Sequence, residues 1–202
     1  MQNLELVKDA LEKRNFEVKL FENAQQAKDY LLAVIDPAQT VGFGGSATLS
    51  GMGMHETLAQ HGNRLFYHGT GSAQDREQAH VDASNADVYL SSANAILTDG
   101  RIINIDGHGN RVSALIHGPA KVILVVGKNK IASTYDEAIH RIKTQACPAN
   151  ARRLGRKTPC ATLGYCTDCS SPDRMCNGTL ILERTPTSHP IEVLLVNEEL
   201  GY

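Results

Sequence analysis

Apolar residues recur along the chain with two different periods, and segments of the two kinds alternate. A period of three to four residues, typical of a helix with one buried face, occurs at 4–11, 24–34, 49–60, 73–83 and 135–145. Short runs of apolar and β-branched residues, which favour strands, occur at 16–21, 40–43, 64–68, 87–90, 122–126, 179–183 and 192–196. This alternation predicts an α/β fold with a mostly parallel sheet flanked by helices.

Local details add a hairpin and an insertion to this outline. Residues 122–126 form an unbroken apolar run, which is typical of a parallel strand that is buried on both faces. Asp99 and Gly100 separate two apolar stretches within 96–105 and predict a β-hairpin, because both residues tolerate positive φ. Prolines and glycines interrupt the periodicity between 147 and 177, so we expect a cysteine-rich loop insertion near the C-terminus.

The composition fits one globular domain over residues 1–202. Of the 202 residues, 42% are hydrophobic, and 20 Lys and Arg stand against 22 Asp and Glu. A chain of this length buries enough apolar surface to fold without disulfides or metals, and its composition excludes a disordered or collagen-like protein. With a net charge of −2 and no long Lys/Arg run, we expect no nucleic-acid partner.

The N-terminal segment lacks the features of an export signal. Residues 1–15 are charged and helix-periodic, whereas a signal peptide needs an unbroken apolar core. The longest apolar run, 122–126, is far shorter than the roughly 20 residues that span a bilayer. We therefore expect a cytoplasmic protein without membrane contact. In that compartment, cysteines favour metal binding or redox chemistry over structural disulfides.

A glycine-rich turn joins a predicted strand to a predicted helix. Gly44 and Gly45 follow the strand at 40–43, and Ser46 and Thr48 open the helix. Backbone N–H groups, the helix dipole and the two hydroxyls could bind an anion there, at the strand end where open α/β sheets hold ligands. The alternative is a tight turn with Ser46 as the helix cap. The run matches neither a P-loop nor the GxGxxG dinucleotide motif.

Polar residues concentrate between positions 94 and 111. The candidates for binding an anionic or hydroxylated ligand are Asn94, Asn110 and Arg111. Asn94 follows a predicted strand, and the Arg111 guanidinium can clamp a carboxylate or phosphate with two parallel hydrogen bonds. Asp99 is better explained as a turn residue of the hairpin.

All five cysteines lie between positions 147 and 176. Four of them form the pattern Cys160-x5-Cys166-x2-Cys169-x6-Cys176, in which the C-x-x-C pair spaces two sulfurs for one metal. Four thiolates suit an iron-sulfur cluster or zinc, and the spacing matches neither a ferredoxin run nor a standard zinc ribbon, so both metals stay open. Cys147 is a candidate fifth thiol. The alternatives are inert buried thiols, reactive thiols, or a disulfide that forms on oxidation.

Three segments resemble the LUD-domain family of lactate-utilisation proteins, which belongs to the fold superfamily of glucosamine-6-phosphate deaminase, ribose-5-phosphate isomerase and the CoA transferases. They are VGFGGSATLSGMG at 41–53, SSANAILTDGRIINIDGHGNRVSALIHGPAKVILVVGKNKI at 91–131 and PCATLGYCTDCSSPDRMCN at 159–177. The resemblance implies an open, Rossmann-like sheet. It also implies a role beside iron-sulfur redox partner proteins, because some relatives assist the cytoplasmic oxidation of L-lactate to pyruvate.

The resemblance bears on the candidate residues as well. In the phosphosugar isomerases of the superfamily the Gly/Ser/Thr loop binds phosphate, and Gly44, Gly45, Ser46 and Thr48 occupy the comparable place. Those enzymes carry acidic residues after the next strand, where this chain has Ser-Ser-Ala-Asn at 91–94, so no general base is evident there. No glutamate nucleophile of the CoA transferase kind is evident either.

Three functions are consistent with these patterns. The first is a lactate-utilisation-type protein that binds a small anionic ligand at the glycine-rich turn and holds a metal centre on its cysteines. The second is a metal-free isomerase or transferase that binds a sugar phosphate or an acyl-CoA. The third is a non-catalytic regulatory subunit, which the missing base suggests. A homo-oligomer is expected only because such assemblies are common.

Overall fold

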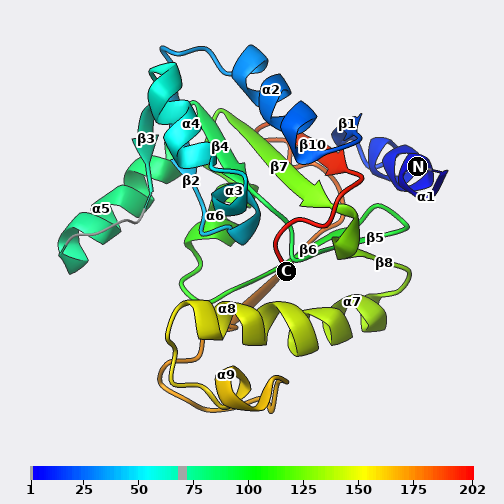
Figure 1. Cartoon of the computed structure of the whole chain (residues 1–202), viewed down its shortest axis with the longest axis vertical. Coiled ribbons are helices and arrows are strands. Elements are labelled where there is room, and N and C mark those ends of the chain that lie inside the picture. Colours follow the sequence, from blue (N-terminus) through cyan, green and yellow to red (C-terminus); the bar gives the residue numbers. More distant parts are fainter. Residues whose placement is uncertain (1, 68–71) are drawn as a thin grey trace.

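Two sheets with helices around them make up the computed structural model, which describes residues 2–67 and 72–202. The larger sheet has six strands, all parallel, in the order β1-β10-β7-β4-β2-β3 (Figure 1). In that order the strands are Glu17–Phe21, Ile191–Val196, Lys121–Gly127, Val88–Ser91, Thr40–Phe43 and Arg64–Phe66. The α/β class and the parallel sheet expected from the sequence are confirmed.

The smaller sheet is mixed and follows the order β8-β5-β6-β9. Strands β5 (Ala95–Leu97) and β6 (Ile102–Asp106) form the predicted antiparallel hairpin around Asp99 and Gly100. Gly100 has a φ of +88°, and a Cβ at this position would lie 2.5 Å from the carbonyl oxygen of Ala10. The turn therefore requires glycine. The remaining strands, β8 and β9, are Ile131–Ala132 and Gly178–Leu182.

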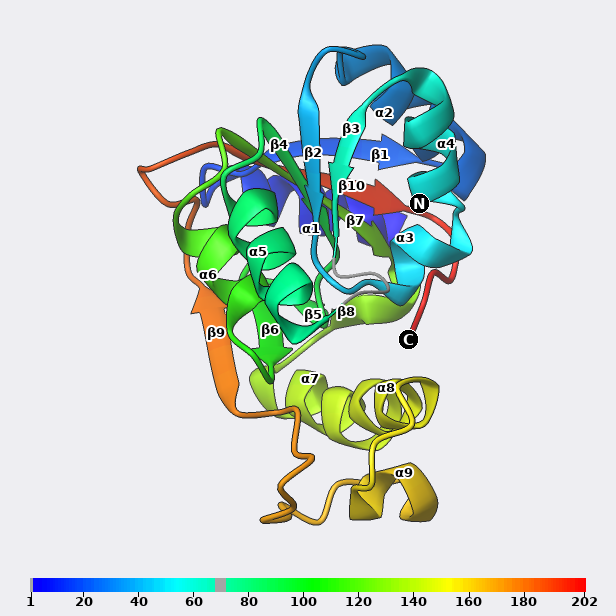
Figure 2. The same cartoon turned by 90° about the vertical axis from the view of Figure 1, so that its left-hand side faces the viewer.

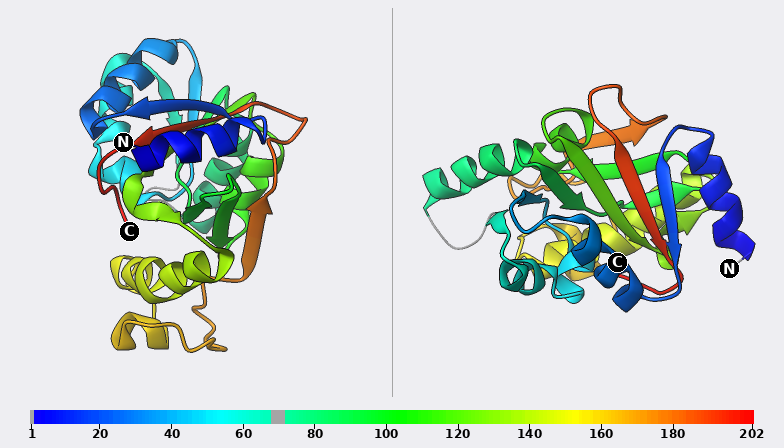
Figure 3. Two further views of the ribbon diagram at one scale, coloured as in Figure 1. Left: turned by 90° about the vertical axis from the view of Figure 1, so that its right-hand side faces the viewer. Right: turned by 90° about the horizontal axis from the view of Figure 1, so that it is seen from above.

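Helices cover both faces of the parallel sheet (Figure 3). One face carries α2 (Ala24–Val34), α3 (Ala47–Gly51) and α4 (Met54–His61). The other face carries the smaller sheet with α1 (Gln2–Glu12), α5 (Ala73–Ser84) and α6 (Asn110–Ile116). Within β7, Val122, Leu124 and Val126 belong to the core on the second face, whereas Ile123 and Val125 belong to the core on the first. The apolar run at 122–126 is thus buried on both sides, as predicted.

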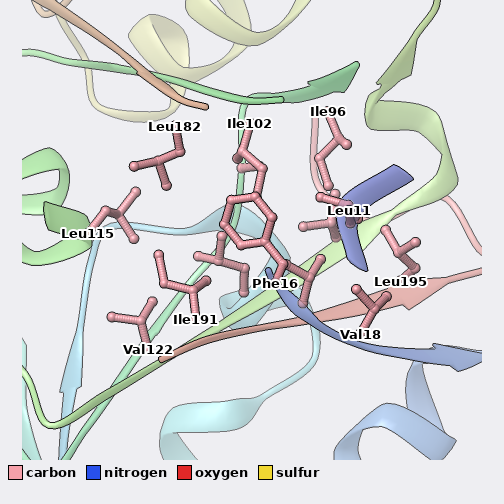
Figure 4. Packing of buried hydrophobic residues seen from close by; sticks show 14 of the residues in the cluster. Leu11, Phe16, Val18, Ile96, Ile102, Leu115, Val122, Leu182, Ile191 and Leu195 are labelled. Carbon is pink, nitrogen blue, oxygen red and sulfur yellow. The ribbon is translucent and has the colours of Figure 1, made fainter. Parts of the chain in front are cut away.

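Figure 4 shows the core between the two sheets. Phe16 packs there among aliphatic side chains from the parallel strands, the smaller sheet, α1 and α6. The labelled members are Leu11, Phe16, Val18, Ile96, Ile102, Leu115, Val122, Leu182, Ile191 and Leu195. Because this core joins the two sheets, it fixes the smaller sheet relative to the carboxyl ends of the parallel strands.

A long helical segment lies on the far side of the smaller sheet (Figure 2). α7 (Tyr135–Arg141) continues through a π-helical turn, η2 (Ile142–Ala146), into α8 (Cys147–Arg153). A third apolar cluster joins this segment to β5, β6 and β8. α9 (Pro159–Leu163) and the loops with the other cysteines lie outside α8 in Figure 2.

The structure departs from the sequence-based outline in several places. The helix predicted at 49–60 is split into α3 and α4, because Gly53 takes a left-handed conformation with a φ of +66°. The strand predicted at 64–68 ends at Phe66, and residue 68 lies outside the described residues. α6 has no counterpart among the predicted helices, and the cysteine-rich insertion contains α8 and α9 rather than loops alone. Within the described ranges, no helix is both long and apolar enough to cross a membrane.

Candidate ligand cavity and cysteine cluster

The carboxyl ends of β2, β4 and β7 meet at one edge of the parallel sheet. The segments that follow these strands meet α8 there and enclose a cavity of about 60 Å³. Open α/β sheets bind ligands at this edge. Gly45 borders the cavity, and the polar side chains of the lining include those of Ser46, Ser92, Asn94, Arg111, Lys130, Asn150 and Tyr202.

The glycine-rich turn caps a helix and also borders the cavity. The Ser46 Oγ accepts the backbone N–H of Leu49 at 3.3 Å, so the helix-cap interpretation is confirmed. Ser46 and Gly45 line the cavity as well. Gly44 is tightly enclosed: a Cβ there would lie 2.9 Å from the Cδ of Arg111. The turn therefore needs glycine at position 44 for close approach of the Arg111 side chain, while positions 45 and 46 line the inner cavity.

Lys130 is the cavity residue that the sequence analysis did not single out. It ends the 3₁₀ turn η1 (Lys128–Lys130), which follows β7, and it is 4% exposed. Its Nζ donates to the Oγ1 of Thr48 at 2.9 Å and to the Oγ of Ser92 at 3.0 Å. Burial, together with the positive charges of Arg141 and Arg111, lowers the pKa of Lys130 to about 7. Near neutral pH this side chain is therefore part ammonium and part neutral amine.

Arg111 is held by its own hydrogen bonds. Its Nη1 donates to the Oδ1 of Asn104 at 2.6 Å and to the carbonyl of Ser92 at 3.3 Å. Its Nη2 donates to the Oδ1 of Asn94 at 3.0 Å and to the carbonyl of Ile105 at 2.7 Å. Four of the five N–H donors are engaged in this way, so the guanidinium joins the segment after β4 to β6. Its charge borders the cavity, but a two-pronged clamp on a ligand would require some of these bonds to open.

The two predicted asparagines lie in different places. Asn94 lines the cavity, and its Oδ1 also accepts the backbone N–H of Ile105 at 2.8 Å. Asn110 starts α6, and its Nδ2 lies 3.1 Å from the Nδ1 of His80, beside a wider outer cleft. Of the seven predicted ligand residues, four line the inner cavity: Gly45, Ser46, Asn94 and Arg111. Thr48 lies directly behind it, in contact with Lys130.

Arg141 adds a third positive charge near the cavity. It is 7% exposed, its Nε donates to the carbonyl of Asn129 at 2.7 Å, and its Nη1 donates to the carbonyl of Asn94 at 2.8 Å. Among the described residues, no carboxylate forms an ion pair with Lys130, Arg111 or Arg141. These three side chains, the cation cluster, therefore leave positive charge at the cavity that no ion pair within residues 2–67 and 72–202 neutralises.

The cysteines line a second, smaller cavity directly beside the first. This cavity measures about 20 Å³, and all five cysteines border it as free thiols. Cys147 and Met175 border both cavities. In the part of the chain that the structure describes, no three His, Cys, Asp or Glu side chains are arranged to hold a metal ion. The five thiols therefore border one cavity, but their positions do not form the coordination geometry of a metal site.

The π-helical turn explains how the cysteine-rich segment reaches this place. The backbone N–H of Cys147 bonds back to the carbonyl of Ile142, five residues earlier. Pro148, the next residue, has no N–H to continue the series, and the carbonyl of Lys143 accepts the backbone N–H of Cys166 at 2.9 Å instead. Burial, together with the neighbouring thiols, raises the pKa of Cys147 to about 12, so this thiol stays neutral.

A single guanidinium holds the loop that carries three of the cysteines. Arg174 donates to the carbonyl of Cys169 at 2.6 Å and to the carbonyl of Cys176 at 3.3 Å. It also forms an ion pair with Asp168 at 2.9 Å. The backbone N–H of Asp168 in turn donates to the Sγ of Cys166 at 3.3 Å. Asp168 and Arg174 together hold Cys166, Cys169 and Cys176 in one loop.

Comparison with known proteins identifies the family of this chain. A model of the LUD domain matches residues 4–196. The chain belongs to the LUD domain family. A crystal structure of a DUF162 family protein from Deinococcus radiodurans aligns with a TM-score of 0.52 over 96% of each chain, at 15% sequence identity, which shows a shared fold. No curated protein matches the sequence.

One signal in the sequence of this LUD domain could have identified Lys130. The segment Gly127-Lys128-Asn129-Lys130 directly follows the buried strand β7, and the carboxyl ends of parallel strands are where ligands bind. A Lys-Asn-Lys sequence is also typical of a solvated turn, and Lys128 is indeed exposed. Only the tertiary arrangement separates the two lysines.

Proposed function

We propose that this LUD-domain protein is a cytoplasmic lactate-utilisation protein. It binds L-lactate or a similar small carboxylate in the inner cavity and holds a metal centre on Cys160, Cys166, Cys169 and Cys176. In this proposal it assists oxidation of the carboxylate together with iron-sulfur redox partner proteins. The observation that carries the ligand assignment is Lys130, a buried amine with no acidic partner among the described residues.

A carboxylate fits the charge and the size of the inner cavity. A buried ammonium without an acidic partner is costly, and an anion that enters the cavity would relieve this cost for the whole cation cluster. The hydroxyls of Ser46 and Ser92 and the amide of Asn94 supply further polar contacts on the lining. A volume of about 60 Å³ suits a small ligand of this kind.

The cavity residues would bind, orient and charge-balance such a ligand. As a carboxylate arrives, the Lys130 Nζ is held in its protonated form, because an adjacent negative charge raises the pKa of an amine. Arg111 and Arg141 are fixed by backbone and amide oxygens, so they would contribute charge without moving. Ser92 accepts from Lys130 and keeps its Nζ at the cavity wall.

The same lining argues against an acid-base isomerase. No Asp or Glu among the described residues lines the inner cavity, and aldose–ketose isomerisation needs a group that removes a proton from carbon. Lys130 is the titratable amine of the lining, and its position beside the positive charges of Arg111 and Arg141 suits it to bind an anion. A small-carboxylate site is therefore the better explanation of this cavity.

The cysteine cavity supports the metal assignment. The four cysteines of the motif line one space, the N–H of Asp168 faces the sulfur of Cys166, and Arg174 holds the loop. Cys147 is left out of the set because its high pKa keeps the thiol neutral. When bound, an iron-sulfur cluster would supply electron transfer beside the ligand cavity, whereas zinc would supply a structural clip.

Metal analysis tests the cysteine assignment directly. Protein purified without oxygen should contain zinc, or iron with sulfide, in a fixed ratio to the chain. We expect the double variant Cys166→Ser/Cys169→Ser to lose the metal and Cys147→Ser to keep it, because four thiols remain in the single variant. Metal-free wild-type protein, or a double variant with unchanged metal content, would show that the assignment is wrong.

Calorimetric titration with sodium L-lactate tests the inner cavity. We expect Lys130→Met to weaken binding by at least about tenfold, since a hydrogen bond to a charged group contributes about 1.5–3 kcal/mol. The matched control is Lys128→Met, an exposed lysine of the same turn, which should bind as the wild type does. Equal affinity in wild type and Lys130→Met, or no lactate binding to either, would contradict the proposal.

A further inference from the structure

A wider cleft opens directly outside the inner cavity. It has a volume of about 750 Å³ and shares five lining residues with the cavity, namely Gly45, Ile105, Arg111, Asn150 and Met175. The cleft and the inner cavity are therefore neighbours with a shared wall. A carboxylate of lactate size would fill little of this cleft, whereas pockets of about 300–1,000 Å³ suit larger organic ligands.

Arginines line both walls of the cleft. One wall comes from α5, the turn after β6 and the start of α6, and it carries Arg76 and Arg111. The opposite wall comes from the end of α8 and the cysteine-rich segment, and it carries Arg153, Arg156 and Arg174. Figure 2 shows α5 and β6 on one side and α8 on the other. Guanidinium groups on two sides of one cleft suit a ligand with several anionic oxygens, above all phosphate.

The acidic side chains of the cleft are engaged elsewhere. Asp106 accepts three backbone N–H groups of its own turn at 2.8–3.2 Å. Asp173 accepts the backbone N–H of Lys157 at 2.8 Å. Glu77 lies 3.9 Å from the Nε2 of His108. None of these three carboxylates forms an ion pair with an arginine of the cleft.

Arg76 and Arg156 are the guanidinium groups most open to a ligand. Both are exposed, and neither side chain has a hydrogen bond or an ion pair with any residue in the described ranges. Arg153, by contrast, donates to the Oδ1 of Asn150 and to the hydroxyl of Tyr202. A ligand could therefore bind Arg76 and Arg156 without breaking an existing contact.

We propose that the outer cleft binds the diphosphate group of a nucleotide-type ligand between Arg76 and Arg156. This would be a second ligand, adjacent to the small carboxylate of the inner cavity and different from it in chemistry. The site combines a space of nucleotide size, arginines on two opposite walls, and carboxylates that leave those arginines unpaired.

Titration with ADP, in low salt and without divalent cations, tests the proposal. We expect ADP to bind the wild type more tightly than AMP does, and adenosine to bind weakest, because the phosphates supply the contacts. The double variant Arg76→Ala/Arg156→Ala should raise the Kd for ADP by about tenfold or more, since charge-assisted contacts are lost from both walls. Added salt should weaken ADP binding in the wild type.

The matched control removes the same charge from outside the cleft. Arg152→Ala/Lys128→Ala replaces two exposed cations that do not line it, and we expect the wild-type Kd for ADP. Unchanged circular dichroism and urea midpoints would show that both double variants are folded. The proposal is overturned if ADP does not bind at millimolar concentrations, or if adenosine binds as tightly as ADP. An equal Kd in wild type and Arg76→Ala/Arg156→Ala would overturn it too.

Discussion

Replacing Lys130 by methionine measures how much the buried amine of the inner cavity lowers the free energy of unfolding. The substitution keeps an unbranched side chain and removes the charge. The two hydroxyls that lose their donor, Thr48 Oγ1 and Ser92 Oγ, lie 3.4 Å apart and can bond each other. Lys128→Met is the matched control, because Lys128 belongs to the same turn and is exposed.

The magnitude follows from the pKa of Lys130 in the folded and unfolded states. A pKa of about 7 in the folded protein against 10.5 in the unfolded chain corresponds to about 5 kcal/mol. Because the folded value is the lower one, the unfolded chain binds more protons between the two, and the free energy of unfolding rises with pH across this window. Between pH 7 and pH 9 this side chain alone adds about 2 kcal/mol. Below pH 7 both states are protonated, and the full cost of burial remains.

Urea unfolding at pH 7 and pH 9 gives the answer. Far-UV circular dichroism is a suitable signal because the chain has no tryptophan, and the buffers should contain a reductant but no carboxylate or phosphate. Other titrating groups cancel when the wild type is compared with each variant. We expect wild-type stability to gain about 2 kcal/mol relative to Lys130→Met between these pH values, and no such gain relative to Lys128→Met. A constant difference between wild type and Lys130→Met would refute the reasoning.

The other predictions concern the segments around the cavity. Arg111→Lys should lower the free energy of unfolding by about 2–3 kcal/mol in urea titrations, because an ammonium cannot replace the four hydrogen bonds that the guanidinium donates; an unchanged midpoint would contradict this. Gly42→Ala should lower the free energy of unfolding by about 1–3 kcal/mol or more, because its Cβ would lie 2.2 Å from the carbonyl oxygen of Ala83. Gly51→Ala in α3 should be neutral or stabilising, because its Cβ would have no neighbouring atom within 4 Å. Lactate binding at pH 8 should take up close to one proton, because Lys130 is mostly neutral before binding and charged afterwards. Calorimetry in two buffers of different ionisation enthalpy measures this uptake, which Lys130→Met should abolish.

The parts of the fold that the sequence predicts correctly are those with a strong local signal. The apolar run of β7 and the Asp-Gly turn of the hairpin each specify one structure regardless of their neighbours. β8 has only two residues, and β9 pairs with β6 across more than seventy positions, so neither pairing has a local signal. The helix predicted to end near 145 runs on through Pro148, because a π-helical turn removes the need for the N–H that proline lacks.

In the candidate site, too, the residues with a local sequence signal were predicted, and the contacts between distant segments were not. The glycine-rich turn and Asn94 follow strand ends, and Gly45, Ser46 and Asn94 all line the cavity at that edge of the sheet. That they bind a ligand there remains a prediction. Arg111 was expected to clamp a ligand, and its hydrogen bonds instead go to Asn104, Asn94 and two carbonyls of the chain. Partners of this kind come from β6 and the segment after β4, and no local pattern specifies them.

The shared wall of the two cavities links the two halves of the proposed function. Cys147 and Met175 border both spaces, and the segment that carries Cys166 is bonded to the π-helical turn immediately before Cys147. A metal bound by the four motif cysteines would therefore fix the position of Met175, which lies between Cys169 and Cys176 in the sequence and borders the inner cavity. Metal binding should then affect the lining of the inner cavity directly, through the position of Met175, and needs no movement of the parallel sheet.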